Sequence, residues 1–195
     1  MAIPEIGTVA PSFRLPSGHG DPVGLEDYRG RNSVIVWFTK GMACPFCRAQ
    51  MTRVARVHPE IRARDAEVLQ LTISNPRQAQ TYASKFKIPF PYLSDSEYRV
   101  RREWGIEVRS HGPLYYANAM VAGMRAPKPA NDFGDFAPPM AEMPRMLADD
   151  DMGFFVVDKG GIVQFSLAGS YIEPGVGDRP LPSNDEILAE LDRCR

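Results

Sequence analysis

Two cysteines, Cys44 and Cys47, stand in a Cys-x-x-Cys spacing, which places two thiols about one helical turn apart. Thiols at this spacing can close a tight disulfide, so the motif points to redox chemistry or to metal binding. A pair of inert core cysteines is the structural alternative. Structural zinc normally needs four ligands, and the remaining candidates show no paired spacing: His19, His58, His111 and Cys194. The pattern therefore favours redox chemistry, with no metal or organic cofactor.

The residues around the motif predict a junction between a strand and a helix. Residues 33–39 are a continuous β-branched and aromatic run, typical of a strand buried on both faces. After it, Pro45 suits the first position of a helix, and apolar residues recur at helical spacing to residue 61. Pro59 is expected to kink or end that helix. Both cysteines would then lie at a helix N-terminus, whose partial positive charge stabilises a thiolate.

Three neighbours of the motif are candidate supporting residues. Lys40 and Arg48 are close enough in sequence to add positive charge near a thiolate. Trp37 directly precedes the loop and could form a wall of the site. The alternative for Trp37 is packing within the core of the sheet.

The remaining elements alternate between strands and helices, which predicts a three-layer α/β fold with a central mixed sheet and helices on both faces. A hairpin is expected within residues 12–25. Further strands are expected at 68–73, 154–158 and 162–167, and an extended segment at 88–95. One helix is expected from a cap at 74–75 to about residue 86. A second follows the extended segment and runs to about residue 104, and a last one opens at the capping box of Ser183 and Glu186.

The 195 residues fit one domain with an irregular, proline-rich insertion at about 107–152. Such an insertion is a lid, a binding loop or a plain surface loop. Lys and Arg total 23 against 24 for Asp and Glu, so a nucleic-acid partner is not expected. No apolar stretch reaches membrane-spanning length, and residues 1–16 contain no signal-like run. We therefore expect no membrane partner and a cytoplasmic location.

Beyond these patterns, the sequence resembles the alkyl hydroperoxide reductase/thiol-specific antioxidant (peroxiredoxin) family of the thioredoxin-like fold. The matching segments are GTVAPSF (7–13), LEDYRG (25–30), VIVWF (34–38), FPYLSD (90–95) and FFVVD (154–158). Residues 38–47 are similar to the peroxiredoxin-like branch that carries a Cys-x-x-Cys. In that branch the second cysteine takes the peroxidatic place, so the resemblance implies this role for Cys47. Cys44 then stands where peroxiredoxins have a threonine.

The sequence departs from that family at three positions that bear on the chemistry. Lys40 replaces a proline, Cys44 replaces the threonine, and residues 149–153 lack the arginine that precedes the late strand. In the family, that threonine and arginine orient the peroxide. The cis-proline of thioredoxin-type reductases is also replaced, by Gly153. Three arginines could supply a replacement guanidinium or could be solvated surface charges: Arg48, Arg53 and Arg109.

The sequence thus predicts a thiol-dependent redox protein that cycles a Cys44/Cys47 dithiol and disulfide. As a disulfide reductase, it would attack through Cys44 and resolve through Cys47. As a peroxidase, it would attack through Cys47 and condense with Cys44. Thioredoxin or glutathione is the expected reductant, and a homodimer is among the assemblies that the resemblance allows. The alternative is a non-catalytic redox sensor or interaction module. Cys194 is either a distant resolving thiol or a small apolar residue of the last helix.

Overall fold

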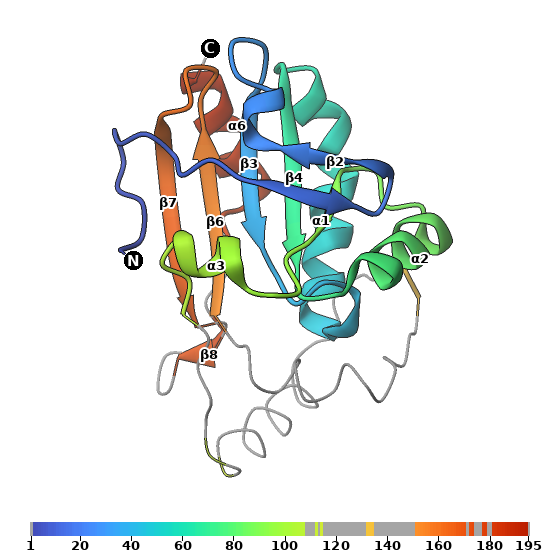
Figure 1. Cartoon of the computed structure of the whole chain (residues 1–195). Helices are drawn as coiled ribbons and strands as arrows, with labels where there is room; N and C mark the ends of the chain where they lie inside the picture. The colour runs from blue at the N-terminus through green and yellow to red at the C-terminus, as the bar shows by residue number, and fades with distance from the viewer. Residues whose placement is uncertain are drawn as a thin grey trace.

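The computed structural model describes residues 2–107, 112, 114, 132–134, 151–170, 172–173, 177–178 and 181–194. A seven-stranded sheet with the order β2-β1-β5-β4-β3-β6-β7 forms its centre (Figure 1). β4 runs parallel to β3 and β5, whereas the other pairs are antiparallel, so the sheet is mixed. Its strands are β1 (Arg14–Ser17), β2 (Gly20–Gly24), β3 (Ser33–Phe38), β4 (Ala66–Thr72), β5 (Tyr92–Ser94), β6 (Asp151–Val157) and β7 (Val163–Ser170). A separate pair is formed by β8 (Ile172–Glu173) and β9 (Gly177–Asp178).

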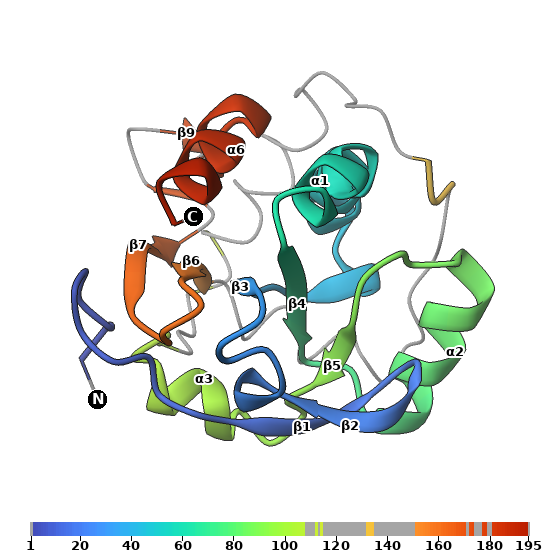
Figure 2. The same cartoon turned by 90° about the horizontal axis from the view of Figure 1, so that it is seen from above.

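Helices cover both faces of this sheet (Figure 2). One core cluster joins the sheet to α1 (Pro45–Arg62), α2 (Pro76–Phe86) and α6 (Asn184–Arg193), through side chains such as Met51, Tyr82 and Ile187. A second cluster joins the other face to α3 (Arg99–Glu103) and the N-terminal segment, through side chains such as Val100 and Phe13. The predicted three-layer, thioredoxin-like α/β architecture is confirmed.

The central strands owe their stability to burial on both faces. Every residue of β3 and of β4 is buried, as the uninterrupted apolar run of β3 predicts. In the parallel register Trp37 lies beside Gln70, and in the antiparallel register Phe38 lies beside Gly153. β3 and β4 therefore end, and β6 begins, at the same edge of the sheet. α1 also begins at this edge (Figure 1).

Two element boundaries differ from the expected ones. α1 passes through Pro59 and ends three residues later at Arg62. A proline removes one helical hydrogen bond, and the buried side chains of Val57 and Ile61 hold the last turn on the sheet. β6 begins at Asp151, inside the segment expected to be an insertion, because Asp151 already pairs with Ser170 of β7. Most of the expected insertion lies outside the described residues, so its role and the single-domain division stay predictions.

The predicted caps and hairpins are confirmed. Asn75 caps α2 through a capping box with Gln78, and Ser183 caps α6 through the predicted box with Glu186. β1 and β2 form the expected N-terminal hairpin, and β6 and β7 form the late one.

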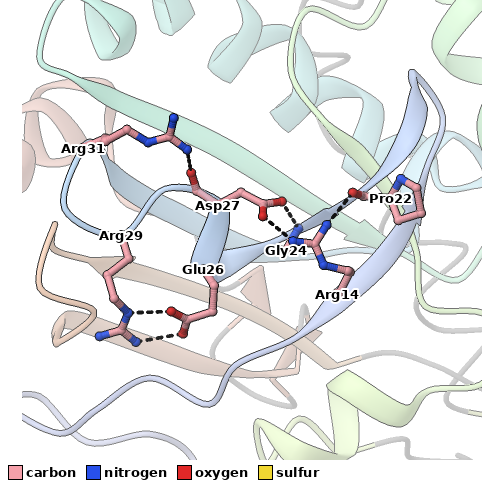
Figure 3. A network of polar contacts seen from close by, with 7 residues as sticks. All are labelled: Arg14, Pro22, Gly24, Glu26, Asp27, Arg29 and Arg31. Atoms are coloured by element: carbon pink, nitrogen blue, oxygen red, sulfur yellow. Dashed lines mark hydrogen bonds and ion pairs between the residues drawn. The ribbon is translucent and has the colours of Figure 1, made fainter.

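An exposed network of charges holds the turn after β2, where the short 3-10 helix η1 (Leu25–Asp27) lies (Figure 3). The Asp27 carboxylate accepts a hydrogen bond from the Gly24 N–H at 2.9 Å and pairs with the Arg14 guanidinium. Arg29 donates to both carboxylate oxygens of Glu26, at 2.6 and 2.8 Å. The Gly24 N–H and the Arg14 guanidinium lower the pKa of Asp27. Residues 22–31 together with Arg14 are called the η1 corner below.

Candidate active site

Cys44 and Cys47 lie at the N-terminus of α1, as predicted. Cys44 is the N-cap residue in an extended conformation, and its Sγ accepts a hydrogen bond from the Cys47 N–H at 3.4 Å. Both cysteines are free thiols; Cys44 is 7% exposed and Cys47 is fully buried. Cys44 therefore receives the backbone hydrogen bond and the helix dipole that stabilise a thiolate. Closing a disulfide between an N-cap and the third residue of the same helix needs little backbone motion.

Buried hydrogen bonds fix the segment that leads into the motif, residues 39–44, called the Cys loop below. The Thr39 hydroxyl oxygen accepts from the Gly41 N–H at 2.8 Å and from the Gln70 amide at 2.9 Å. The Met42 N–H donates to the Tyr92 hydroxyl at 2.9 Å. The loop turns through a short 3-10 helix, η2 (Gly41–Ala43), before it reaches Cys44.

Gly41 is required in this turn for two reasons. Its φ of +66° lies in the left-handed region that favours glycine. A Cβ at this position would also collide with the Tyr92 hydroxyl and press on the Thr72 side chain. The same tyrosine that accepts the Met42 N–H therefore leaves no room for a side chain at residue 41.

Arg48 is not a solvated surface charge, and that expectation is wrong. The residue is buried, and its Nη1 donates to the Met42 carbonyl oxygen at 2.7 Å. The first turn of α1 thus directs this guanidinium back onto the Cys loop, where it satisfies a carbonyl group of the short helix Gly41–Ala43. Lys40 is also buried, with 9% exposure. Arg48 therefore contacts the Cys loop, and the supporting role of Lys40 stays a prediction.

Trp37 packs in the core of the sheet. It is fully buried and makes an edge-to-face contact with Phe154, with ring centroids 6.4 Å apart. It belongs to the same cluster as Met42 and Met51, which flank the motif in sequence. The packing interpretation of Trp37 is therefore confirmed.

Of the other proposed replacements for the missing guanidinium, Arg53 is bound elsewhere in the fold. Arg53 donates to the Pro182 carbonyl at 2.7 Å and to the Asn184 side chain at 3.0 Å, so it ties α1 to the start of α6. Arg53 is half-buried and bonded to these two groups, which contradicts the solvated alternative, and burial lowers its pKa. Arg109 lies outside the described residues.

Cys194 has the environment of a structural thiol. It follows α6, packs against the core cluster on that face, and its Sγ donates to the Glu190 carbonyl at 3.1 Å. Burial raises the pKa of Cys194 to about 11, which leaves little thiolate at neutral pH. This environment supports the small apolar interpretation over a resolving role.

The sequence did not reveal three residues that hold the Cys loop. Tyr92 and Gln70 contact it from β5 and β4, and Arg101 reaches the Thr39 carbonyl from α3. Arg101 stands among other arginines in the sequence and reads as part of a charged surface. A weak signal was available for Gln70, which is a polar residue between the apolar Leu69 and Leu71 in the middle of β4.

Among the described residues, no His, Cys, Asp and Glu side chains gather in a group that could hold a metal ion. Within the same part of the chain, no helix combines the length and apolar character needed to cross a bilayer.

Comparison with known proteins extends the resemblance read from the motifs. A sequence profile of the AhpC/TSA family matches residues 6–131. The chain belongs to the AhpC/TSA family. It is 30% identical over 108 residues to the chloroplastic peroxiredoxin Q of Gentiana triflora, an alignment covering 55% of this chain and 49% of that protein. It is 28% identical over 102 residues to peroxiredoxin Bcp of Escherichia coli K12, covering 52% and 65% respectively. The chain thus spans about half the length of the curated relatives it matches.

Solved peroxiredoxin structures share the fold of this AhpC/TSA protein. The crystal structure of peroxidoxin BcpB from Mycobacterium tuberculosis superposes with a TM-score of 0.65 at 18% identity, covering 98% of this chain and 99% of that one. A cysteine-to-serine variant of the Xylella fastidiosa PrxQ also gives a TM-score of 0.65, at 12% identity, with 97% and 96% covered. These structures support the thioredoxin-like architecture.

Proposed function

We propose that this protein is a thiol-dependent peroxidase that cycles Cys44 and Cys47 between dithiol and disulfide. One observation carries the proposal: the Cys44 Sγ accepts the Cys47 N–H at 3.4 Å, so both thiols lie within the first turn of one helix. Membership of the AhpC/TSA family supports peroxide as the oxidant. It does not favour a non-catalytic sensor or interaction module.

In the proposed cycle, the Cys47 thiolate attacks one oxygen of the peroxide and the O–O bond breaks. The other oxygen leaves and takes up a proton as water or an alcohol, and Cys47 becomes a sulfenic acid. The Cys44 thiolate then attacks the Cys47 sulfur, hydroxide leaves as water after protonation, and the disulfide forms. A thiol reductant of the thioredoxin or glutathione class returns both residues to thiols by exchange.

The surroundings of the two cysteines differ, and each suits one step of this cycle. Cys44 receives a backbone hydrogen bond, which favours the thiolate that must attack the sulfenic acid. Cys47 is fully buried, which suits a small peroxide rather than a bulky one. Arg48 and Lys40 bring two buried positive charges to the same turn and loop. This is the kind of environment that stabilises thiolates.

The test is stopped-flow fluorescence of the reduced protein mixed with hydrogen peroxide, with single-cysteine variants beside it. Cys47→Ser should lose the fast phase. Cys44→Ser should keep it and stop at a sulfenic acid that a dimedone-type probe traps. Cys194→Ser is the matched control and should behave as wild type, because its thiol is held against Glu190. A wild-type rate no faster than that of a free thiol would disprove the peroxidase.

One observation favours a second candidate, a disulfide reductase. Cys44 is the more exposed of the pair and caps the helix, the place of an attacking thiolate in disulfide exchange. In that case Cys44→Ser would abolish reduction of a protein disulfide such as insulin. Cys47→Ser would trap a mixed disulfide on Cys44. Slow reaction with peroxide together with these two outcomes would establish the reductase.

The reductant, the assembly and the location belong to the same proposal. Reduction of the disulfide form by thioredoxin or by glutathione can be compared directly in a coupled assay. Size-exclusion chromatography of both redox forms tests the homodimer, and fractionation of cells tests the cytoplasmic location. Equal elution of the two forms together with clear turnover would eliminate the sensor interpretation.

A further inference from the structure

Arg101 is a buried cation that the proposed cycle does not yet use. It belongs to α3, which lies on the face of the sheet opposite α1, and it is 1% exposed. Arginine is almost never fully buried in proteins unless partners satisfy its charge and its donors. The groups that contact the guanidinium should therefore indicate the role of Arg101.

The Arg101 guanidinium joins the ends of two neighbouring strands. Its Nη1 donates to the Asp151 carbonyl oxygen and its Nη2 to the Thr39 carbonyl oxygen, each at 2.9 Å. Its Cζ lies over the Phe38 ring, 5.7 Å from the ring centroid. Thr39 directly follows β3 and Asp151 is the first residue of β6. The guanidinium thus links these strands at the edge where the Cys loop begins.

Thr39 transmits this contact to the motif. Its carbonyl oxygen is held by Arg101, and its hydroxyl oxygen accepts the Gly41 N–H at 2.8 Å. Gly41 opens the 3-10 turn that ends at Cys44, the N-cap of α1. A shift of Thr39 would therefore move the turn that places the Cys44 Sγ beside the Cys47 N–H.

The base of α3 is itself held firmly. The Asp95 carboxylate, just after β5, accepts the Val100 N–H at 3.1 Å and the Arg101 N–H at 2.8 Å. β5 also carries Tyr92, whose hydroxyl accepts the Met42 N–H. Arg101 therefore contacts the Cys loop from a helix whose start is hydrogen-bonded to Asp95, directly after β5. β5 in turn contacts the same loop through Tyr92.

We propose that Arg101 is a positioning residue that fixes Thr39 against β6 and so holds Cys44 at the N-terminus of α1. An arginine suits this place because its rigid fork can donate to two carbonyl groups at once, whereas a lysine presents a single compact charge. The kinetic part of this inference rests on the proposed function, since it concerns the rate at which Cys44 attacks the Cys47 sulfenic acid. The geometric part concerns the thiols alone and can be measured without peroxide.

The test compares the full-length variants Arg101→Met and Arg101→Lys with Arg102→Met as the matched control. Arg102 is the next residue, is exposed, and donates to the Glu97 carbonyl. Arg101→Met should slow formation of the Cys44–Cys47 disulfide after peroxide addition about 100-fold, the effect of misplacing a reacting group by an ångström, and should leave the fast Cys47 phase in place. It should also shift the pH profile of Cys44 alkylation to higher pH. Arg101→Lys should restore part of both, and Arg102→Met should match wild type.

A merely structural role would lower the melting temperature without moving the pH profile. A folded Arg101→Met variant with the wild-type alkylation profile would therefore overturn the inference. If that variant does not fold, amide hydrogen exchange of Gly41 and Met42 in Arg101→Lys decides: faster exchange supports the inference, and unchanged exchange overturns it. If wild type itself fails to reduce peroxide, the proposed function falls, while the alkylation profile still decides the role of Arg101.

Discussion

The Cys loop and the η1 corner each place a three-residue 3-10 helix shortly after a strand, but they are held in opposite ways. Around the Cys loop the partners are buried, such as the Tyr92 hydroxyl and the Gln70 amide. Around the η1 corner they are exposed charges, such as the pair of Arg14 and Asp27, whose side chains are 56% and 37% exposed. The same local structure is thus stabilised by desolvated contacts in one region and by screened ion pairs in the other.

This difference has a thermodynamic consequence. Leaving a buried donor without its partner costs about 1–3 kcal/mol, because water cannot replace the lost contact. An exposed ion pair contributes about 0–1 kcal/mol, because water and salt compete with it. The two regions also perturb carboxyl groups in opposite directions. Burial raises the pKa of Asp95, which follows β5, whereas hydrogen bonds lower the pKa of Asp27 in the η1 corner.

The largest expected effect is that of Gly41→Ala in the Cys loop. It forces an L-residue into the left-handed region and drives a Cβ into the Tyr92 hydroxyl. Strain and overpacking together should lower the free energy of unfolding by about 2–5 kcal/mol. Urea denaturation measures this loss, and the peroxide reaction should slow in the same variant.

Gly30→Ala in the η1 corner is the matched control. Gly30 has a similar φ of +75°, but a Cβ there meets no atom within 4 Å. It should therefore cost only about 1–2 kcal/mol, from backbone strain alone, and leave the peroxide reaction unchanged. Equal losses for the two alanine variants would contradict the claim that the Cys loop is fixed by close packing.

A smaller effect is expected for Tyr92→Phe, which removes the acceptor of the Met42 N–H while keeping the ring. The unfolding free energy should fall by about 1–3 kcal/mol because the amide lies in a buried loop. Amide exchange of Met42 should accelerate. Gly41→Ala should also cost less in the Tyr92→Phe background, since the collision is relieved. Strict additivity of the two substitutions would argue against this coupling.

The smallest effect is expected for Asp27→Asn in the η1 corner. The amide oxygen can still accept the Gly24 N–H, so the change isolates the charge and should cost less than about 1 kcal/mol at neutral pH. The folded pKa of Asp27 is lowered, so the unfolded chain binds the proton more tightly. The charge contribution is thus present above its ordinary pKa of 3.8 and is lost as the pH falls through the lower folded value. Denaturation of both proteins over this range measures it, and a pH-independent difference would contradict the sign.

Local sequence patterns determined most of the scaffold. The apolar run before the motif, the capping residues of α2 and α6, and the late hairpin are each recognised from residues near in sequence. The position of Cys44 and Cys47 at a helix N-terminus follows from the same signals, because Pro45 opens the helix that the strand leads into. The family resemblance could likewise be read from short segments.

Only the tertiary structure decided what surrounds the two cysteines. Tyr92, Gln70 and Arg101 come from three elements distant in sequence, and pattern arguments do not tell which polar side chain a fold will bury. Arg48 was misread for the same reason, since a charged residue reads as exposed until a specific partner, here the Met42 carbonyl oxygen, compensates its burial. Periodicity reports which face of an element is apolar, whereas the partners of a buried polar group depend on how the elements meet.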